Sequence, residues 1–415
     1  MNIFSCHLLV VSCLLHLNSF SQSVCIKDIK SGCKAFNPDP QPNETISWAG
    51  NCKQGLINGS GTLIWYNNGN EVARHVGLFE NGKPNGKGRF TIKNGDSTEG
   101  NFVMGSIVNL DENMLKDLHV HELDITDSTD IYAADGISKS LFYYAIKPTG
   151  AIKGTLLLFS GTMETPADVV NNNVSFLKLA HENNLMVIIP SINNNLFISR
   201  AALSFINYAI ADAIKNYKLE SQKFILGGFS LGGMTALRYT ELSVEDKSKT
   251  IVHPVAVYAI DSPLDFLRLY SSFSRISDNH FSEGAANEAN YYLQKMNAQF
   301  GGTPSVNEKI YATNSIFSRN EKNGGNTAFL KNTPVRVYCD PDIDWWLKNR
   351  AQDLYDSNAI DLTAFINCLN IAGNKDATFI NCIGKGYRLD GSRHPHAWSI
   401  VDANDCMKWL NTYLK

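Results

Sequence analysis

Three features that define common protein classes are missing from this 415-residue sequence. Beyond residue 22, no apolar run approaches the roughly 18 residues that a membrane-spanning helix needs. No Cys-x-x-Cys pair occurs, so a zinc site has little support. The formal net charge of −3 provides no strong positive field for nucleic acid or an anionic membrane surface. We therefore expect no integral membrane segment, no metal and no nucleic-acid partner.

The N-terminal segment has no Lys or Arg ahead of its apolar core at residues 8–15. Small and polar residues follow that core, and this arrangement is typical of a cleaved secretory signal. We predict a signal peptide at residues 1–22 and a secreted or periplasmic protein. The alternative interpretation of this segment is a short buried helix.

Cysteines are few but unevenly placed. Seven follow the predicted signal: Cys25, Cys33, Cys52, Cys339, Cys368, Cys382 and Cys406. An exported chain can form disulfides, and Cys25 with Cys33, and Cys368 with Cys382, are near enough in sequence to pair. Because the count is odd, at least one thiol remains free or pairs outside the chain.

After a leader at residues 23–47, residues 48–110 carry an internal repeat. Gly50, Gly77 and Gly100 stand at matching positions, 27 and then 23 residues apart, with aromatic residues nearby. The pattern resembles the MORN repeat, with two good copies and a partial third. It predicts short stacked hairpins with glycines at the turns. The resemblance implies a structural or docking element, and a stabilising extension without a ligand is the simpler interpretation.

From residue 115 onward, apolar strands alternate with helices. Predicted strands lie at 138–146, 154–159, 185–190, 224–229, 254–260, 334–339 and 377–382, and predicted helices at 167–183, 201–217 and 402–414. Strands that are apolar on both faces and alternate with helices indicate a mostly parallel sheet covered on both sides. The composition, 44% hydrophobic and 19% charged, is sufficient for such a core.

Ser230 lies at the centre of Gly228-Phe229-Ser230-Leu231-Gly232, between a predicted strand and a predicted helix. A sharp turn at this point would expose the serine, and the flanking glycines would let strand and helix pack closely around it. In this context the chain at 115–415 resembles the α/β-hydrolase fold, which implies that Ser230 is a nucleophile. The polar stretch 264–333, with one helical patch around 285–300, lies where this family inserts a lid, although an inert excursion remains open.

The family order of serine, acid and histidine implies partners further along the chain. Three carboxylates follow the strand after the lid; we expect Asp340 to close that strand, and rank Asp342 first and Asp344 second as the acid. Asp261 and Asp265, after the preceding strand, are a less common place for it. For the base, the loop Arg393-His394-Pro395-His396-Ala397-Trp398 favours His396, with His394 as a supporting or substrate-facing group.

An oxyanion hole requires one N–H from Leu231 and a second from the loop after the strand ending at Phe159, where Thr162 and Met163 are equal candidates. The resemblance thus implies an exported serine hydrolase that cleaves a small-molecule, glycan or acyl ester through an acyl-enzyme, without a cofactor. A serine peptidase or amidase on the same fold, and a catalytically inactive binding protein, are the alternatives.

Overall fold

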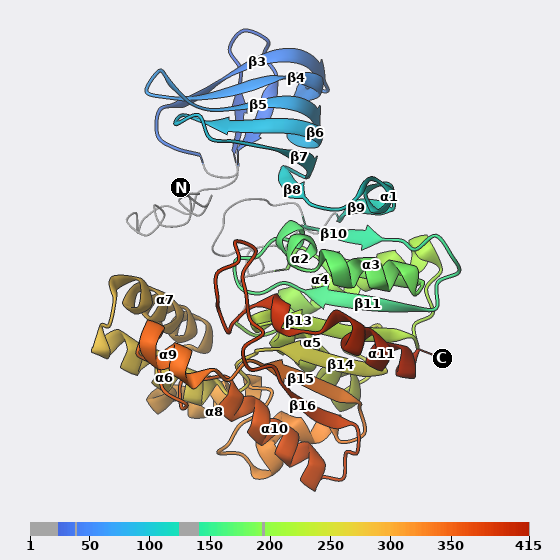
Figure 1. The fold of residues 1–415 in the computed structure, drawn as a ribbon, viewed down its shortest axis with the longest axis vertical. Helices are drawn as coiled ribbons and strands as arrows, with labels where there is room; N and C mark the ends of the chain where they lie inside the picture. Colours follow the sequence, from blue (N-terminus) through green and yellow to red (C-terminus); the bar gives the residue numbers. More distant parts are fainter. Residues whose placement is uncertain (1–23, 38–39, 124–140, 193–195, 415) are drawn as a thin grey trace.

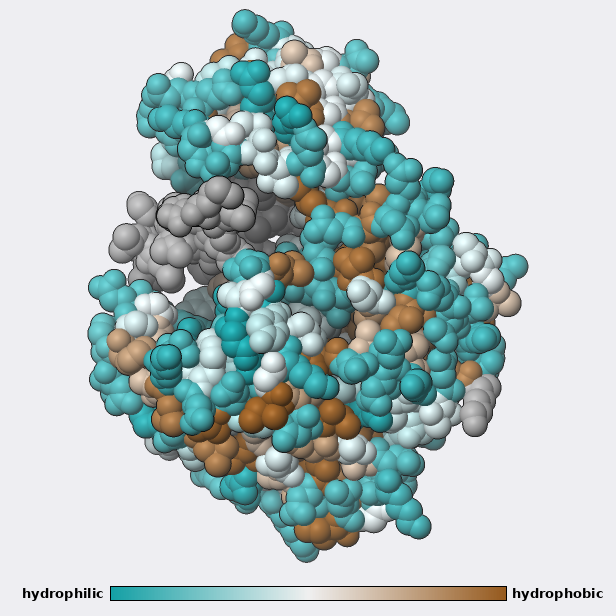
Figure 2. All heavy atoms as spheres, in the orientation of Figure 1, coloured by the Kyte–Doolittle hydropathy of each residue, from teal (hydrophilic) through white to brown (hydrophobic). Residues whose placement is uncertain are grey.

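A computed structural model of the chain describes residues 24–37, 40–123, 141–192 and 196–414, which form an N-terminal β-region and a larger α/β domain (Figure 1). The predicted signal peptide at 1–22 and the start of the strand predicted at 138–146 lie outside these residues, so export stays a prediction. Within the described ranges, no helix combines the length and apolar character needed to cross a bilayer. The face shown in Figure 2 is mostly hydrophilic, with apolar side chains in small scattered groups.

The N-terminal region is an eight-stranded sheet. Its strands are β1 (Val24–Lys27), β2 (Lys34–Asn37), β3 (Glu44–Lys53), β4 (Leu56–Asn67), β5 (Asn70–Glu80), β6 (Lys83–Ile92), β7 (Ser97–Val103) and β8 (Ser106–Val108). From β3 to β8, each strand pairs antiparallel with the next. The predicted stacked hairpins are therefore present, and they form one continuous meander.

Five glycines stand opposite one another across five strands of this sheet. The register pairs Gly50 with Gly61, Gly61 with Gly77, Gly77 with Gly88, and Gly88 with Gly100. The absence of side chains makes room for rings from the same face. A Cβ on Gly61 would lie 2.2 Å from the Trp48 ring, and one on Gly88 would lie 2.5 Å from the His75 ring. The repeated glycines thus permit close aromatic packing inside the sheet.

The segment predicted as a leader belongs to this sheet. It forms β1, β2 and the first part of β3, and β2 is joined to β4. The disulfide pairs Cys33 with Cys52, a residue of β3. The pairings suggested by sequence proximity are not formed, because Cys25, Cys368 and Cys382 are free thiols.

The α/β domain has its own eight-stranded sheet, in the order β16-β15-β14-β13-β11-β12-β10-β9. The strands are β9 (Leu118–Leu123), β10 (Leu141–Ile146), β11 (Gly154–Phe159), β12 (Leu185–Pro190), β13 (Phe224–Phe229), β14 (Ala256–Ile260), β15 (Val335–Cys339) and β16 (Ala377–Asn381). The six neighbouring strands β12, β11, β13, β14, β15 and β16 are parallel, whereas β10 pairs antiparallel with both β9 and β12.

Helices cover both faces of this sheet. They are α1 (Glu112–Lys116), α2 (Pro166–Asn172), α3 (Val174–Glu182), α4 (Arg200–Tyr217), α5 (Leu231–Glu245), α6 (Phe266–Asn279), α7 (Glu283–Phe300), α8 (Pro304–Asn314), α9 (Ile343–Arg350), α10 (Ala359–Ile371) and α11 (Ala403–Tyr413), with short 3₁₀ segments η2 (Lys322–Leu330) and η3 (Trp398–Ile400). Along β11, Leu157 and Phe159 join the core under α4, α5 and α10, whereas Leu156 and Leu158 join the core under α2, α3 and α11. The predicted α/β-hydrolase fold class is confirmed by this two-sided sheet.

The two sheets are connected through β8. Val108, Leu110 and Met114 are buried in the core under α2, α3 and α11. Asn171 of α2 accepts the Asn109 N–H at 2.8 Å and donates its amide to the Ile107 carbonyl at 2.9 Å. The repeat region is thus attached to the domain by packing as well as by the chain.

The glycine register makes a stability prediction. We expect Gly61→Ala to lower the free energy of unfolding by about 1–3 kcal/mol, because the new methyl group would overlap the Trp48 ring. Urea unfolding followed by tryptophan fluorescence measures the change. Gly100→Ala is the matched control: its Cβ meets only the movable Ile107 side chain, at 3.3 Å, and should cost less. Equal stability of the two variants would contradict the packing argument.

Candidate active site

The strained turn predicted at Ser230 is present between β13 and α5. Ser230 has φ 54° and ψ −123°, a conformation that non-glycine residues rarely adopt. Its N–H donates to the Ile260 carbonyl at 2.8 Å. A Cβ on Gly232 would lie 2.4 Å from the Ser160 carbonyl oxygen, and one on Gly228 would lie 2.4 Å from the Gly232 carbonyl oxygen. The glycines therefore permit the close packing that holds the serine at the turn.

His396 lies beside this turn and contacts an aspartate. Its Nδ1 is 2.5 Å from Oδ2 of Asp261, whose side chain is only 5% exposed, whereas the imidazole is 27% exposed. The ring of Phe229, the residue before Ser230, lies 4.4 Å from the His396 ring, centroid to centroid. A buried carboxylate thus orients a partly exposed imidazole next to the serine turn.

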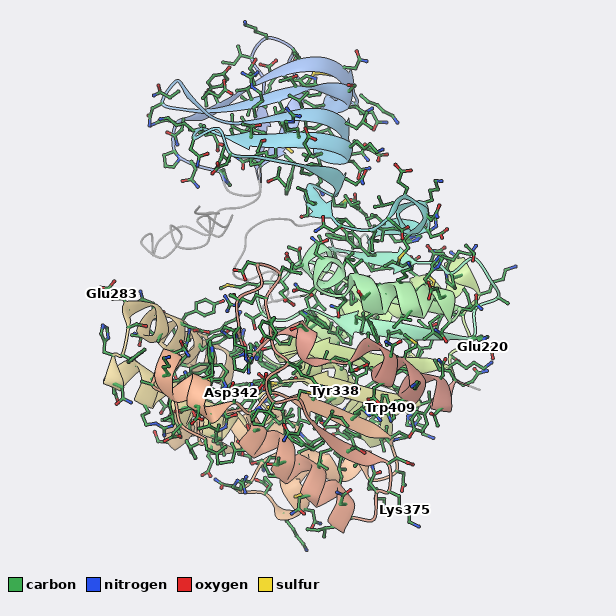
Figure 3. All side chains as sticks on the ribbon, viewed as in Figure 1. Glu220, Glu283, Tyr338, Asp342, Lys375 and Trp409 are labelled. Carbon is green, nitrogen blue, oxygen red and sulfur yellow. A yellow bond between two sulfur atoms is a disulfide. The ribbon has the colours of Figure 1, made fainter. Side chains whose placement is uncertain are left out.

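The aspartate in this contact is not the one ranked first from the sequence. Asp342 caps the N-terminus of α9 by accepting the Trp345 N–H at 3.0 Å, and it pairs with the Arg393 guanidinium at 2.8 Å (Figure 3 labels Asp342). Asp344, the second choice, is exposed in the first turn of α9. The structure therefore places Asp261, instead of Asp342 or Asp344, against His396.

The physical reason lies in the histidine loop itself. Arg393 pairs with Asp340 and with Asp342, each at 2.8 Å. Asp340 closes β15, as expected, and also accepts the N–H groups of Gly384 and Gly386. The carboxylates after β15 therefore anchor the loop that carries His396. The sequence signal for Asp261 was its position directly after β14, the strand that pairs with β13, which ends just before Ser230.

Asp261 is held by groups that the sequence did not single out. The Cys339 thiol donates to its second carboxylate oxygen at 3.2 Å, and the Asn358 amide donates to its backbone carbonyl at 2.9 Å. Its own N–H donates to the Tyr338 carbonyl at 2.8 Å. Burial raises the pKa of the Cys339 thiol well above its usual value, so this thiol remains a neutral donor.

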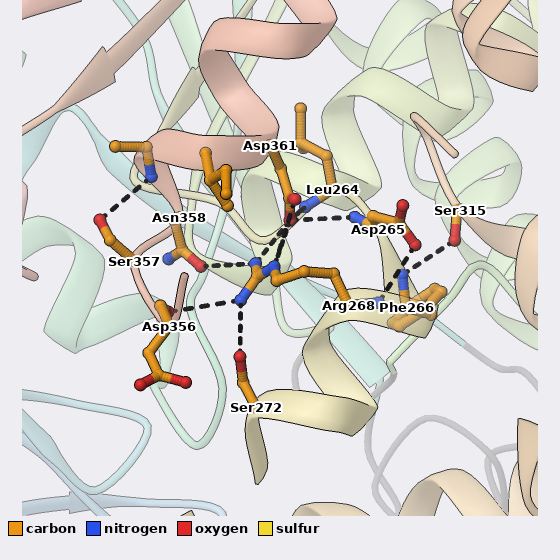
Figure 4. Close-up of polar contacts among 12 residues, drawn as sticks. Leu264, Asp265, Phe266, Arg268, Ser272, Ser315, Asp356, Ser357, Asn358 and Asp361 are labelled. Atoms are coloured by element: carbon orange, nitrogen blue, oxygen red, sulfur yellow. Dashed lines mark hydrogen bonds and ion pairs between the residues drawn. The ribbon is translucent and has the colours of Figure 1, made fainter. Parts of the chain in front are cut away.

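A buried ion pair supports Asn358 from the lid side (Figure 4). Arg268 of α6 pairs with Asp361 of α10 at 2.5 Å, and both side chains are less than a tenth exposed. The same guanidinium donates to the Asn358 side chain at 3.4 Å and to the Asp356 carbonyl at 3.3 Å. Asp361 also accepts the N–H groups of Leu264 and Asp265. The base of the lid and the acid beside His396 thus share one hydrogen-bond network.

His394 supports the loop and does not contact an acid. Its Nδ1 lies 3.2 Å from the His396 backbone nitrogen, and its ring packs against the edges of Trp345 and Trp346. Burial lowers the pKa of His394 to about 3. The imidazole is therefore neutral near pH 7 and can accept the His396 N–H.

The candidate oxyanion donors have no acceptor in the described residues. Among the described residues, none accepts a hydrogen bond from the N–H groups of Leu231, Thr162 or Met163. Met163 has φ 64° and is 56% exposed. Gly161, by contrast, donates its N–H to Glu164 at 2.7 Å. Leu231 with Thr162 or Met163 thus remain the candidate oxyanion donors.

The predicted lid at 264–333 is mostly helical. The helix expected around 285–300 corresponds to α7, whereas α6 and α8 were not predicted. The Tyr292 ring of α7 stacks on Phe273 of α6 at 4.8 Å, and the Tyr292 side chain lies near Thr162 of the oxyanion loop. The polar composition of this stretch did not indicate α6 and α8, because one apolar stripe is enough to pack a helix.

In the described parts of the chain, no group of three His, Cys, Asp or Glu residues could hold a metal ion.

Comparison with known proteins identifies the repeats. Residues 49–70 and 75–97 match the MORN repeat. These two MORN repeats confirm the sequence interpretation of that region.

The α/β domain is similar to several solved esterases. Carboxyl esterase 2 from the mycorrhizal fungus Tuber melanosporum is 14% identical, with a TM-score of 0.46, over 72% of this chain and 87% of that one. A lipase/esterase from Lactobacillus plantarum is 11% identical, with a TM-score of 0.41, over 71% and 97%. An S-formylglutathione hydrolase from Agrobacterium tumefaciens is 10% identical, with a TM-score of 0.40, over 72% and 95%. No curated protein sequence matches the chain.

The low pKa of His394 makes a prediction about acid stability. The folded-state pKa of about 3 is below the usual His value of about 6.5, so protons bind the unfolded chain more readily. The stability contributed by neutral His394 is present above about pH 6.5 and is lost progressively as the pH falls toward 3. His394→Asn keeps an acceptor for the His396 N–H without this titration. Its unfolding free energy should fall less between pH 7 and pH 4 than that of the wild type, as measured by urea denaturation; an equal fall would contradict the assignment.

Proposed function

We propose that the protein is a serine hydrolase that cleaves carboxylic esters, with Ser230 as nucleophile, His396 as general base and Asp261 as the orienting acid. The observation that carries the proposal is the Asp261–His396 contact beside the strained Ser230 turn. A serine hydroxyl needs an adjacent base to act as a nucleophile, and the base works best when a buried acid fixes its tautomer. The Asp261–His396 contact supports the second requirement, and the packing of the His396 ring on Phe229, the residue before Ser230, supports the first.

In the proposed reaction, His396 takes the proton of the Ser230 hydroxyl as its oxygen attacks the ester carbonyl carbon. The carbonyl oxygen becomes an oxyanion that accepts hydrogen bonds from the Leu231 N–H and from the N–H of Thr162 or Met163. His396 then gives its proton to the leaving alcohol, and the acyl group stays on Ser230. Water, deprotonated by His396, then attacks the acyl carbon. The bond between that carbon and Ser230 Oγ breaks, His396 returns the proton to Oγ, and the carboxylic acid is released. Asp261 stays ionised throughout and stabilises the imidazolium that forms twice per cycle.

A fluorophosphonate probe tests this function directly. We expect the wild-type protein to be labelled covalently and Ser230→Ala to remain unlabelled, because the probe reacts with an activated serine hydroxyl. Labelling is read by in-gel fluorescence and by mass spectrometry of the modified peptide. Folded wild type that takes up no label would contradict the proposal and favour an inactive binding protein. Parallel panels of ester and amide substrates, with acyl chains of several lengths and acetylated sugars, separate an esterase from an amidase.

The choice of acid is tested by two conservative variants. Asp261→Asn should lower kcat by about 10³–10⁴-fold, since the amide would hold His396 in the wrong tautomer. Asp342→Asn is the matched control, because it removes a carboxylate charge from the same sheet edge without touching His396. It should stay within a few-fold of wild-type kcat and lose only some loop stability. The reverse ranking in ester hydrolysis assays would return the role to Asp342.

A further inference from the structure

Glu164 occupies the loop between β11 and α2, next to the candidate oxyanion donors. Its carboxylate accepts the Gly161 N–H at 2.7 Å. The indole Nε1 of Trp398, in the histidine loop, lies 3.0 Å from one carboxylate oxygen and 3.1 Å from the other. One side chain therefore contacts both loops that flank the serine turn.

The same glutamate closes the turn that presents the oxyanion donors. Its backbone N–H donates to the Gly161 carbonyl at 3.2 Å, while its side chain accepts the Gly161 N–H. Both polar backbone groups of Gly161 are thus bound to Glu164. Because the Gly161 N–H is used here, it is not available to an oxyanion, whereas no residue in the described part of the chain accepts the N–H of Thr162 or Met163. Glu164 thus closes the turn that carries both candidate donors.

Trp398 extends this contact to the rest of the site. Its ring lies 5.4 Å from the Phe229 ring, which in turn lies 4.4 Å from the His396 ring. A Cβ on Gly161 would lie 2.8 Å from Phe229 and 3.1 Å from Glu164. The oxyanion loop, the serine turn and the histidine loop therefore pack on one another around the Glu164 carboxylate.

Glu164 is not needed to begin the helix that follows. The N-terminus of α2 is already capped by Thr165 and Asp168, whose side chains and backbone N–H groups bond reciprocally. A glutamate that served only α2 would have no reason to reach Gly161 and Trp398. The contacts with Gly161 and Trp398 join the two loops that flank the serine turn.

We propose that Glu164 is a positioning residue for ester hydrolysis, holding residues 161–163 against the histidine loop so that the oxyanion donors and His396 keep their relative places. This inference rests on the function proposed above. A half-buried carboxylate suits the task because charge-assisted hydrogen bonds are shorter and stronger than neutral ones. Small displacements of such groups are costly: about 1 Å can lower a rate by roughly 10²-fold.

The charge of Glu164 also changes near neutral pH. The pKa of Glu164 is raised to about 7: burial is the largest cause and the nearby Asp168 carboxylate adds to it, while the Gly161 and Trp398 donors and His396 oppose it. As pH rises through this value, the carboxylate becomes ionised and accepts more strongly from both donors. This effect should increase activity with rising pH. A glutamine at this position keeps an acceptor oxygen but does not titrate.

Three variants separate positioning from bulk stability. Glu164→Ala removes the carboxylate that accepts from Gly161 and Trp398, and it should lower kcat by about 10–100-fold. KM should change by less than about 3-fold, because the lost interaction acts on the transition state. Glu164→Gln should recover most of that loss and remove the part of the kcat–pH profile centred near pH 7. Glu241→Gln is the matched control. Glu241 is a fully buried glutamate on α5, the helix that follows the serine turn, and burial raises its pKa to about 8. It lies about 16 Å along the helix from Ser230. This control should leave kcat unchanged.

The outcomes distinguish this inference from the proposed function. Wild type that is labelled by fluorophosphonate while folded Glu164→Ala keeps full kcat would overturn the positioning role and leave the hydrolase intact. A pH profile of Glu164→Gln that superimposes on the wild-type profile would do the same. Folded wild type with no labelling would overturn the hydrolase, and the catalytic role of Glu164 with it. A tryptophan fluorescence titration checks the Glu164–Trp398 contact without an activity assay. We expect the wild type to show a transition near pH 7 that Glu164→Gln lacks. A transition retained in Glu164→Gln would contradict the contact.

Discussion

The contact between Asp261 and His396 is the interaction on which the site depends, and it joins residues 135 positions apart. It forms because parallel strands bring their carboxyl ends to one edge of the sheet. Asp261 follows β14 and Ser230 follows β13, and these two strands are neighbours. The histidine loop reaches the same edge from β16. The proposed general base therefore lies beside the proposed nucleophile because of the strand order and of the loops that follow the strands.

Several polar contacts keep that edge in place. Arg393 binds Asp340 and Asp342, which secures the loop carrying His396. On the other side, Arg268 and Asp361 form a buried ion pair that also reaches Asn358 and, through it, the Asp261 backbone. Breaking a buried pair of this kind leaves an uncompensated charge, which costs several kcal/mol. The network thus couples the packing of helix α6, in the predicted lid, to the position of Asp261.

Close backbone approach is a common constraint in both parts of the chain. In the repeat region, facing glycines leave space for the Trp48 and His75 rings on one face of the sheet. At the serine turn, Gly228 and Gly232 let α5 pack directly on β13 and on the end of β11. A single added methyl group would create overlap in either place. Both parts are connected by the buried residues that follow β8, so the repeats form a fixed extension of the α/β domain.

Local patterns were sufficient for much of this architecture. The glycine spacing identified the repeats, the apolar runs identified the parallel strands, and Gly-x-Ser-x-Gly between a strand and a helix identified the Ser230 turn. His396 was favoured by its own loop sequence, and the structure places it beside that turn. Each of these depends on residues near one another in the chain, for which periodicity and turn chemistry are informative.

The sequence by itself thus determined the fold class, the repeat region and the position of the strained serine. Only the tertiary structure decided which aspartate meets His396, which cysteine pairs with Cys33, and how Glu164 links two loops. In each case several residues of the right type were available, and the choice was made by competing long-range contacts. Arg393 binds Asp340 and Asp342 in the histidine loop, and Asp261, one strand nearer the serine, is the carboxylate that reaches the imidazole.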